Sequence, residues 1–300
     1  MRTFEITPAD EGRSPYSLLR NAMPSAPRAL LRKLARDSTL TVNSDIPKES
    51  YQLRVGDVVA LRESARVLEL LALGPCPLDI LHDDVDLLVL NKPAGLAVHP
   101  TEDSTGNDLL SRAAGLAPRL GHCAAYHVVN RLDRWTSGAV LLTPGTRRTA
   151  AFAGMFERRE VDKRYVALVA GAPPYQGTMD DPVDGHPART TFEVLSQGHN
   201  AALVLAHPET GRKHQVRRHF AALGHPLVGD QRYRGPATRK TGGALLHAVA
   251  ITFKHPATGE VLSIVAPLPD PFRCAMDAAG LAPTAIDAMF EALSRLGCRP

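Results

Sequence analysis

Short apolar segments rich in valine and leucine recur along most of this 300-residue chain and constrain its fold more than any other feature. Their length and residue types are those of β-strands. The clearest are residues 86–90, 139–142, 165–169, 202–205 and 245–253. Helical patterns alternate with them irregularly, and one runs from Lys213 to Leu223 and is closed by Gly224. We therefore expect an α+β domain with a mixed sheet, not a doubly wound one.

Composition narrows the class of protein. Hydrophobic residues make up 44% of the chain and charged residues 22%, which suits a soluble protein with a buried core. No apolar run approaches the roughly 20 residues of a membrane-spanning helix, and the N-terminus lacks the pattern of a signal peptide. We therefore expect a cytoplasmic, monomeric protein with no membrane association. The net charge of +4 permits a polyanionic partner but does not indicate one.

Several kinds of catalytic site have no support in the sequence. The chain lacks H-E-x-x-H, G-x-x-x-x-G-K-[ST], G-x-G-x-x-G and G-x-S-x-G, and its twelve histidines are scattered. The four cysteines lie far apart and include no C-x-x-C pair, which argues against a zinc site and a disulfide framework. They are Cys76, Cys123, Cys274 and Cys298. We expect neither a metal nor a cofactor.

The chain is predicted to divide into five stretches. They are a tail at 1–13, a small α/β unit at 14–62, a linker at 63–77, the main domain at 78–270 and a C-terminal helical extension at 271–300. In the extension, Ile286, Met289, Phe290 and Leu293 form a helical stripe. This stripe favours a helix docked on the main domain over a partner-binding element.

One predicted helix of the small unit, residues 27–36, carries arginines at four-residue intervals. Arg28, Arg32 and Arg36 therefore share one exposed face of it. A solvated helix face explains this spacing. A surface that follows the phosphates of a nucleic acid explains it equally well.

A single carboxylate lies among arginines ahead of a predicted strand. The stretch reads Arg131-Leu132-Asp133-Arg134 and is followed by Thr136-Ser137-Gly138. Arginines that are close in space would keep Asp133 ionised, because opposite charge favours the charged form. An ion pair that shapes a turn is the simpler explanation of the tetrapeptide, and a catalytic carboxylate is the other.

Two further polar stretches stand out. Residues 210–219 place eight polar or charged side chains at a junction between a loop and a helix, where an anion site is one adequate explanation. The stretch Asn91-Lys92-Pro93-Ala94-Gly95 is typical of a turn after a strand. Local evidence alone makes Lys92 an ordinary surface lysine.

Taken together and in this order, these stretches resemble the RluA family of pseudouridine synthases over residues 78–269. Residues 130–138 match the family's catalytic segment, usually written H-R-L-D-x-x-T-S-G. The other matching stretches are 87–100, 163–169, 211–219 with 224–230, 246–248, 255–260 and 266–269. Residues 14–62 resemble the small S-four-like RNA-binding domain that often precedes this domain. The resemblance implies a mixed, mainly antiparallel sheet flanked by helices and loops.

The resemblance also assigns roles. The reaction breaks the bond from the base nitrogen to ribose and joins ribose to carbon 5 of uracil. It needs a carboxylate beside the anomeric carbon, as a nucleophile or as a base acting on the sugar. Asp133 matches that carboxylate, and Arg217 matches the basic residue that keeps it ionised. Tyr165 matches the tyrosine that stacks on the uracil and assists proton transfer. Arg131 matches the residue that fills the space left by the flipped uridine.

The remaining predicted substrate-binding residues lie in the matched stretches of the main domain and in the arginine row of the front domain. They are Arg134, Thr136, Lys92, His214 and Gln215 in the main domain, with Arg28, Arg32 and Arg36 in the front domain. Two positions depart from the family pattern. Asn130 stands where histidine is common, and we expect it to be structural. Trp135 replaces a small or polar residue, and it either stacks on RNA or packs against the domain.

The leading hypothesis is therefore an isomerase acting on structured RNA. The front domain favours large-subunit ribosomal RNA over transfer RNA. A second hypothesis is a non-catalytic RNA-binding or ribosome-assembly factor on the same fold, but the presence of Asp133, Tyr165 and Arg217 favours catalysis. A hydrolase that uses Asp133 and a nearby histidine has no supporting nucleophile–base spacing.

Overall fold

The computed structural model divides the chain into two compact units. One comprises Met1–Pro77 with Pro100–Ser111, and the other Leu78–His99 with Arg112–Pro300. The residues that the structure describes are 1–8, 10–23, 28–37, 39–48, 50–64, 67–68, 78–100, 108–114, 116–117, 120–122, 125–238 and 242–298. The predicted linker, residues 63–77, lies largely outside them.

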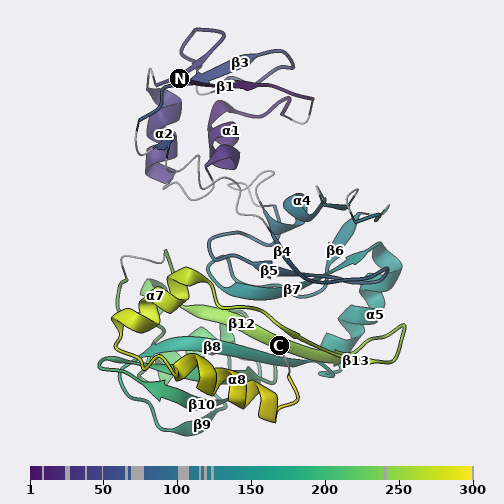
Figure 1. Ribbon diagram of the computed structural model, residues 1–300, viewed down its shortest axis with the longest axis vertical. Helices are drawn as coiled ribbons and strands as arrows, with labels where there is room; N and C mark the ends of the chain where they lie inside the picture. Colours follow the sequence, from purple (N-terminus) through teal and green to yellow (C-terminus); the bar gives the residue numbers. More distant parts are fainter. Residues whose placement is uncertain are drawn as a thin grey trace. The chain divides into compact units, whose positions relative to one another are not determined.

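The first unit packs two helices against a small antiparallel sheet (Figure 1). The sheet has the strand order β1-β3-β2. Its elements are β1 (Arg2–Glu5), α1 (Pro15–Ala22), α2 (Arg28–Arg36), β2 (Leu40–Val42) and β3 (Val58–Leu61). Ser14 caps α1 by accepting a hydrogen bond from the backbone N–H of Ser17 at 3.2 Å. Leu31 and Leu34 of α2 are buried in the unit's core.

The prediction of a loose tail at residues 1–13 is wrong. Residues Arg2–Glu5 pair with β3 as an edge strand, and Ile6 is buried in the core of the first unit. Most side chains of β1 are exposed, so its sequence lacks the alternation of apolar and polar residues that marks a strand. Backbone pairing with β3 holds it in place.

A buried carboxylate ties together the turns of this unit. Asp57 accepts hydrogen bonds from the side chain of Asn43 at 2.8 Å, the hydroxyl of Tyr51 at 3.0 Å and the backbone N–H of Arg54 at 2.9 Å. These bonds lower the pKa of Asp57, with the bond from Arg54 contributing most. Asn43 also has a left-handed backbone (φ 50°), in the turn between β2 and the bridge residue Asp45.

The second unit is built on a ten-stranded mixed sheet in the order β4-β5-β7-β12-β8-β11-β10-β9, with β13 beside β12 and β6 beside β7. The pair β7–β12 is parallel, and the other pairs are antiparallel. The strands are β4 (Asp79–Asp83), β5 (Leu88–Lys92), β6 (Tyr126–Val128), β7 (Ser137–Pro144), β8 (Asp162–Ala170), β9 (Gln176–Met179), β10 (Thr190–Gln197), β11 (Ala201–Pro208), β12 (Leu246–Lys254) and β13 (Val261–Val265). The predicted α+β class with a mixed, mainly antiparallel sheet is confirmed.

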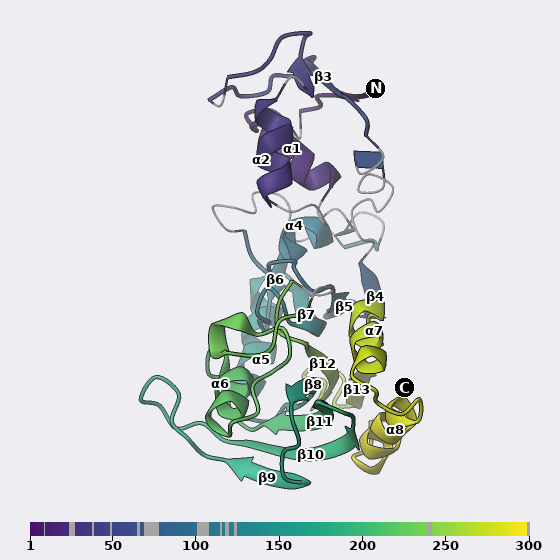
Figure 2. The ribbon, with the colours of Figure 1, turned by 90° about the vertical axis from the view of Figure 1, so that its left-hand side faces the viewer.

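Helices cover both faces of this sheet. The helices of this unit are α5 (Thr146–Glu157), α6 (Gln215–Ala222), the short 3₁₀ helix η2 (Gln231–Tyr233), α7 (Asp270–Ala278) and α8 (Ala285–Arg295); a further helix, α4 (Leu109–Ala114), is divided between the two units. Figure 2 shows α6 on one side of the sheet and α7 and α8 on the other. Along β8, Val166 and Leu168 belong to the core beneath α7 and α8, whereas Ala167 and Val169 pack with α6. Tyr165 follows the second set and packs with the core on the α6 face.

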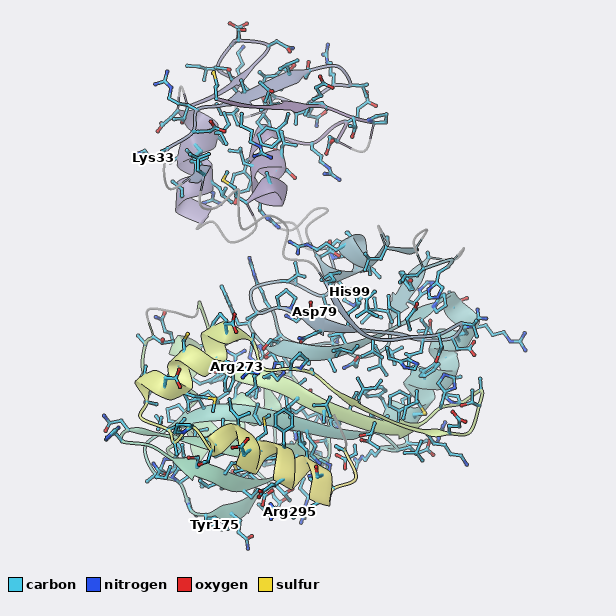
Figure 3. The ribbon with its side chains drawn as sticks, in the orientation of Figure 1. Lys33, Asp79, His99, Tyr175, Arg273 and Arg295 are labelled. Atoms are coloured by element: carbon cyan, nitrogen blue, oxygen red, sulfur yellow. The ribbon has the colours of Figure 1, made fainter. Side chains whose placement is uncertain are left out.

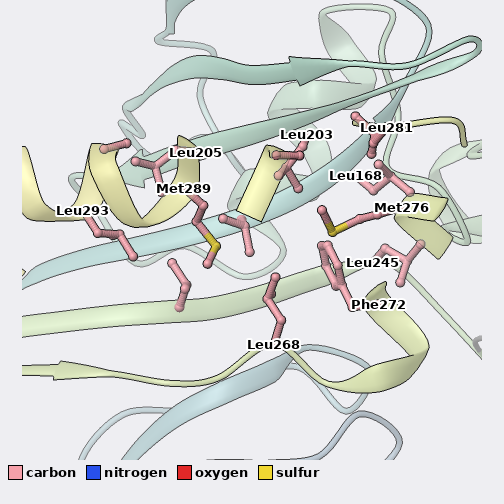
Figure 4. Close-up of a cluster of buried hydrophobic side chains, with 14 of the residues drawn as sticks. Leu168, Leu203, Leu205, Leu245, Leu268, Phe272, Met276, Leu281, Met289 and Leu293 are labelled. Atoms are coloured by element: carbon pink, nitrogen blue, oxygen red, sulfur yellow. The ribbon is translucent and has the colours of Figure 1, made fainter. Parts of the chain in front are cut away.

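The C-terminal helices are part of the main core (Figure 4). Met289 and Leu293 of α8 are buried against the same cluster as Phe272 and Met276 of α7. Each such side chain contributes on the order of 1.5–3 kcal/mol by burial. The predicted docked helix is thus confirmed. Among the described residues, no helix has the length and apolar character needed to cross a membrane.

Candidate active site

Strand register brings the Asp133 segment beside Tyr165. Strand β12 lies between β7 and β8, and its Ala248 is opposite both Gly138 of β7 and Tyr165 of β8. Gly138 has φ +112°, and a Cβ on it would lie 2.3 Å from the carbonyl oxygen of Ala248. Only glycine allows this approach. The Thr-Ser-Gly sequence after Asp133 therefore fixes the start of β7 against β12.

Ser137 and His247, which precede Gly138 and Ala248 in their strands, are also buried. Ser137 and His247 share a hydrogen bond of 2.8 Å between Oγ and Nδ1, and the ring's Nε2 lies 3.1 Å from the carbonyl oxygen of Ala266. Burial lowers the pKa of His247 to about 4, so its ring is neutral at ordinary pH. This pair supports the fold beneath the site.

Asp133 accepts a hydrogen bond from the guanidinium of Arg217, 84 residues further along the chain. Nη1 of Arg217 lies 2.9 Å from Oδ2 of Asp133. Arg217 projects from α6, which begins at Gln215 and not at the predicted Lys213 because His214 has a left-handed backbone (φ 57°). The predicted pairing of Asp133 with Arg217 is present in the structure.

A second carboxylate holds the other edge of the same guanidinium. Nε and Nη2 of Arg217 donate to the two carboxylate oxygens of Asp230 at 2.6 and 2.8 Å. Burial opposes the charge on Arg217, but the hydrogen bonds with Asp230 and Asp133 raise its pKa. Asp230 was not among the predicted site residues, although it ends the matched stretch 224–230.

His214 completes the surroundings of Asp133. Its Nε2 lies 3.5 Å from Oδ1 of Asp133, and its Nδ1 lies 2.9 Å from the hydroxyl of Tyr233. Burial lowers the pKa of His214, and the charge of Arg217 adds to this effect against the opposite influence of Asp133. His214 is therefore mainly neutral at pH 7. Tyr233 is a second residue near the site that the sequence analysis did not assign.

These side chains open into one cavity of about 450 Å³. Its lining includes Asp133, Tyr165, Arg217, His214, Thr136 and Arg131. Burial raises the pKa of Tyr165, and the negative charge of Asp133 adds to this, so the hydroxyl keeps its proton at neutral pH. The cavity thus offers an acceptor, a cation and an uncharged aromatic hydroxyl to one ligand. Among the described residues, no group of His, Cys, Asp and Glu could hold a metal ion.

The other predicted arginines lie at exposed positions. Arg131 lines the cavity with an exposed side chain. Arg134 is exposed too, and its Nε donates to the carbonyl oxygen of Gly95 at 2.8 Å. In the first unit Arg32 and Arg36 are exposed on α2, whereas the side chain of Arg28 lies outside the described residues.

Two predicted substrate-binding residues have structural positions instead. Lys92 is not a surface lysine, because its side chain is fully buried. Its Nζ donates to the carbonyl oxygens of Pro93, Leu96 and Arg134 at 3.0, 2.9 and 3.1 Å. That Nζ reaches into a packed interior could not be read from the neighbouring residues. With its three donors bound to backbone oxygens, Lys92 holds a structural position, and its contact with substrate stays a prediction.

Gln215 is the second correction. Its side chain is 4% exposed, and its amide group donates to Arg189 and Thr190 while its oxygen accepts from Thr210 and Arg212. With its hydrogen-bonding capacity engaged within the protein, Gln215 fastens the start of α6 to β10 and to the loop after β11. It reaches the cavity wall but has no free donor for RNA.

The two departures from the family pattern also have defined positions. Asn130 accepts a hydrogen bond from the backbone N–H of Leu141 at 2.7 Å, so it is structural as predicted. Trp135 lies against glycines, and a Cβ on Gly243 would be 2.3 Å from its Cγ. The packing alternative for Trp135 is therefore realised, although 40% of the residue stays exposed.

Comparison with known proteins identifies the family. Residues 86–222 match the family model described as RNA pseudouridylate synthase. An RNA pseudouridine synthase of Bacillus subtilis, YlyB, is 31% identical over 297 residues, which cover 90% of this chain and 96% of that protein. The chain belongs to the RNA pseudouridine synthases. The predicted RluA family, and with it an isomerase that acts on RNA, is confirmed.

Other members of the family match over most of their length. Ribosomal large subunit pseudouridine synthase C of Yersinia pestis is 33% identical, with 91% of this chain and 94% of that protein covered. Ribosomal large subunit pseudouridine synthase D of Xanthomonas campestris is 29% identical, with 93% and 92% covered. The solved structure of human RNA Pseudouridylate Synthase Domain Containing 4 superposes with a TM-score of 0.58 at 29% identity, over 68% of this chain and 93% of that one.

Proposed function

We propose that this RNA pseudouridine synthase isomerises uridines of large-subunit ribosomal RNA and that Asp133 is its catalytic carboxylate. The observation that carries the proposal is the position of Asp133 in the 450 Å³ cavity, bound by Arg217 and near Tyr165. Two relatives that match most of the chain are named as large-subunit ribosomal RNA enzymes, which supports this choice of substrate.

The reaction requires a flipped uridine whose ribose meets Asp133. The carboxylate acts on the sugar, as a nucleophile at the anomeric carbon or as a base, while the bond to the base nitrogen breaks. The released uracil then turns within the cavity, and its carbon 5 bonds to the anomeric carbon. This step frees the carboxylate from the sugar, or returns to the sugar the proton that the carboxylate took. Carbon 5 then loses its proton and the former glycosidic nitrogen gains one. Tyr165 supports the uracil with its ring, and its protonated hydroxyl is suited to assisting proton transfer.

Arg217 and Arg131 serve different purposes in this scheme. Arg217 neutralises Asp133 through Oδ2, which leaves Oδ1 directed toward His214 and the cavity. Arg131 is exposed at the cavity wall, where it can enter the helix position that the flipped uridine leaves. Arg134, Thr136 and His214 line or adjoin the same opening and are proposed to contact the neighbouring nucleotides.

The first unit is proposed to be the S-four-like RNA-binding domain. Its support is the exposed Arg32 and Arg36 on α2, backed by buried leucines on the opposite face. Guanidinium groups at this spacing fit successive phosphates, which would anchor the RNA while the second unit modifies it.

The test is a map of pseudouridines in ribosomal and transfer RNA from strains with and without this gene. We expect a defined set of large-subunit positions to lose pseudouridine and to regain it with the wild-type gene but not with Asp133→Asn. The variant should still bind RNA, because it loses charge but not shape. The matched control is Asp184→Asn, which alters an exposed carboxylate on another loop. Loss confined to transfer RNA would overturn the substrate, and an active Asp133→Asn enzyme would overturn the mechanism.

A further inference from the structure

We propose that Asp230 is a positioning residue that aims Arg217 at Asp133. The inference rests on the proposed role of Asp133. One guanidinium lies between two carboxylates: its Nε–Nη2 edge is bound by Asp230 through two hydrogen bonds, and Nη1 alone reaches Asp133. The two-bond edge fixes the plane of the group, because a bidentate pair allows a single orientation.

Asp230 is itself held rigidly. Its side chain is 1% exposed, and its backbone lies in a tight turn. The N–H of Asp230 donates to the carbonyl oxygen of Leu227 at 3.1 Å, and its carbonyl oxygen accepts from the N–H of Gly235 at 2.8 Å. A Cβ on Gly235 would come within 1.9 Å of the carbonyl oxygen of Leu227, so the turn closes only around glycine. The carboxylate therefore has a defined place before any RNA arrives.

The division of bonds explains how Asp133 can be both neutralised and reactive. Asp133 is the more exposed carboxylate, at 28% for its side chain, and it receives one bond from Arg217. If Asp230 did not occupy the other edge, Arg217 could turn that edge toward Asp133 and engage both of its oxygens. Asp230 prevents this, so Oδ1 stays available to the ribose. Preorganised charge of this kind lowers the barrier without reorganisation during reaction.

The turn at residues 230–233 also positions His214, the second side chain beside Asp133. Tyr233 donates or accepts the 2.9 Å hydrogen bond with Nδ1 of His214, and the guanidinium of Arg217 lies 5.1 Å from the centre of its ring. Both side chains that face Asp133 are thus oriented by residues 230–233. This turn acts on the reaction through Arg217 and His214. Asp230 is not in the lining of the 450 Å³ cavity; it borders the neighbouring pocket that Asp133 and Arg217 also line, but its side chain is 1% exposed.

The activity test uses the full-length enzyme and large-subunit ribosomal RNA from a strain lacking the gene. We expect Asp230→Asn to lower kcat on the order of 10- to 100-fold, since small misplacements of a catalytic group have effects of this size. KM and RNA affinity should stay within about 3-fold, because Asp230 touches no substrate. The matched control is Asp184→Asn, whose carboxylate pairs at 2.7 Å with Arg218, the next residue on α6, and is exposed. It should retain wild-type kcat.

Thermal unfolding without RNA tests the pairing separately. Arg217→Met leaves Asp230 buried without a countercharge, so it should lower Tm more than the double variant Arg217→Met/Asp230→Asn does. Wild-type kcat in Asp230→Asn, or equal losses of kcat and of RNA affinity, would overturn the positioning role. A Tm of the double variant below that of Arg217→Met would overturn it too. A wild-type enzyme inactive on this RNA would instead refute the proposed substrate and leave the Tm result to decide the pairing.

Discussion

The ammonium group of Lys92 donates a hydrogen bond of 3.1 Å to the backbone carbonyl oxygen of Arg134, the residue that follows the proposed catalytic carboxylate. Two more carbonyl oxygens, of Pro93 and Leu96, accept from the same nitrogen. A single buried side chain thus joins the loop after β5 to the loop before β7. Burial lowers the pKa of Lys92 to about 7, against the opposing effect of Asp133.

Lys92 should make stability depend on alkaline pH. Unfolding restores its ordinary pKa of 10.5, so between pH 7 and 10.5 the unfolded chain binds more protons at this site than the folded one. The free energy of unfolding should therefore rise with pH in this window and lose this gain as pH falls toward 7. Between pH 7 and 9.5 the gain is roughly 3 kcal/mol. Urea unfolding of the wild type and of Lys92→Met measures it.

The comparison variant isolates the contribution of this one group. Lys92→Met keeps the length of the side chain and has no proton to bind, so its stability should change less over the same range of pH. Lys33, an exposed lysine of α2 labelled in Figure 3, provides a control as Lys33→Met that should keep the wild-type slope. Identical slopes for wild type and Lys92→Met would show that Lys92 titrates normally.

Tyr165 should separate stacking from proton transfer. Tyr165→Phe keeps the ring, so KM should change by no more than a few fold, while kcat falls on the order of 10²-fold with the loss of the hydroxyl. Tyr165→Leu also removes the ring, and stacking on a base is worth about 1–3 kcal/mol. The leucine variant should therefore bind RNA more weakly as well. Single-turnover kinetics with measured RNA affinities distinguish these outcomes, and a fully active phenylalanine variant would exclude the proton-transfer role.

Gly138 should tolerate no side chain. Gly138→Ala combines a positive φ with a Cβ only 2.3 Å from a backbone oxygen of β12, so we expect a loss of about 3 kcal/mol or more in the free energy of unfolding. Gly259→Ala is the control, because Gly259 has φ +76° but a nearest atom at 3.7 Å. The control should lose only about 1–2 kcal/mol. Equal losses in the two variants would mean that β7 and β12 can move apart.

The arginine row of α2 should contribute to RNA affinity and to its salt dependence. Replacing Arg28, Arg32 and Arg36 together by alanine should weaken binding and lower the slope of log affinity against log salt by about 2. Arg295 of α8, exposed in the other unit (Figure 3), is the control as Arg295→Ala and should leave the slope unchanged. Filter binding at several salt concentrations provides the measurement. Unchanged binding by the triple variant would show that the arginine row is a solvated helix face and does not bind RNA.

Local patterns were enough for most of the strands. The predicted segments 139–142, 165–169, 202–205 and 245–253 lie within or extend one residue beyond β7, β8, β11 and β12, because buried strands are continuous apolar runs that need no distant information to recognise. The edge strand β1 was missed for the opposite reason. Its side chains face solvent, and only pairing with β3 reveals it.

The site residues also divide into those that sequence motifs identify and those that only the packing reveals. The matched motifs pointed to Asp133, Tyr165 and Arg217, and the register of β12 explains why the loop that carries Asp133 comes beside Tyr165. Nothing local to Asp230 distinguishes it from a surface aspartate. Its role depends on the turn that buries it beside an arginine 13 residues earlier.

The sequence by itself determined the family, the class of fold and the residues proposed to react, because those depend on residue types and their order. The resemblance assigned Arg217 to Asp133, but only the tertiary structure showed that Asp230 holds the other edge of that guanidinium. The arginines closest to Asp133 in sequence, Arg131 and Arg134, are exposed, whereas Arg217 comes from a helix 84 residues further along the chain. The tertiary structure also decided that Lys92 is internal. Desolvation and hydrogen-bond geometry depend on what packs around a group, and distant segments supply that packing.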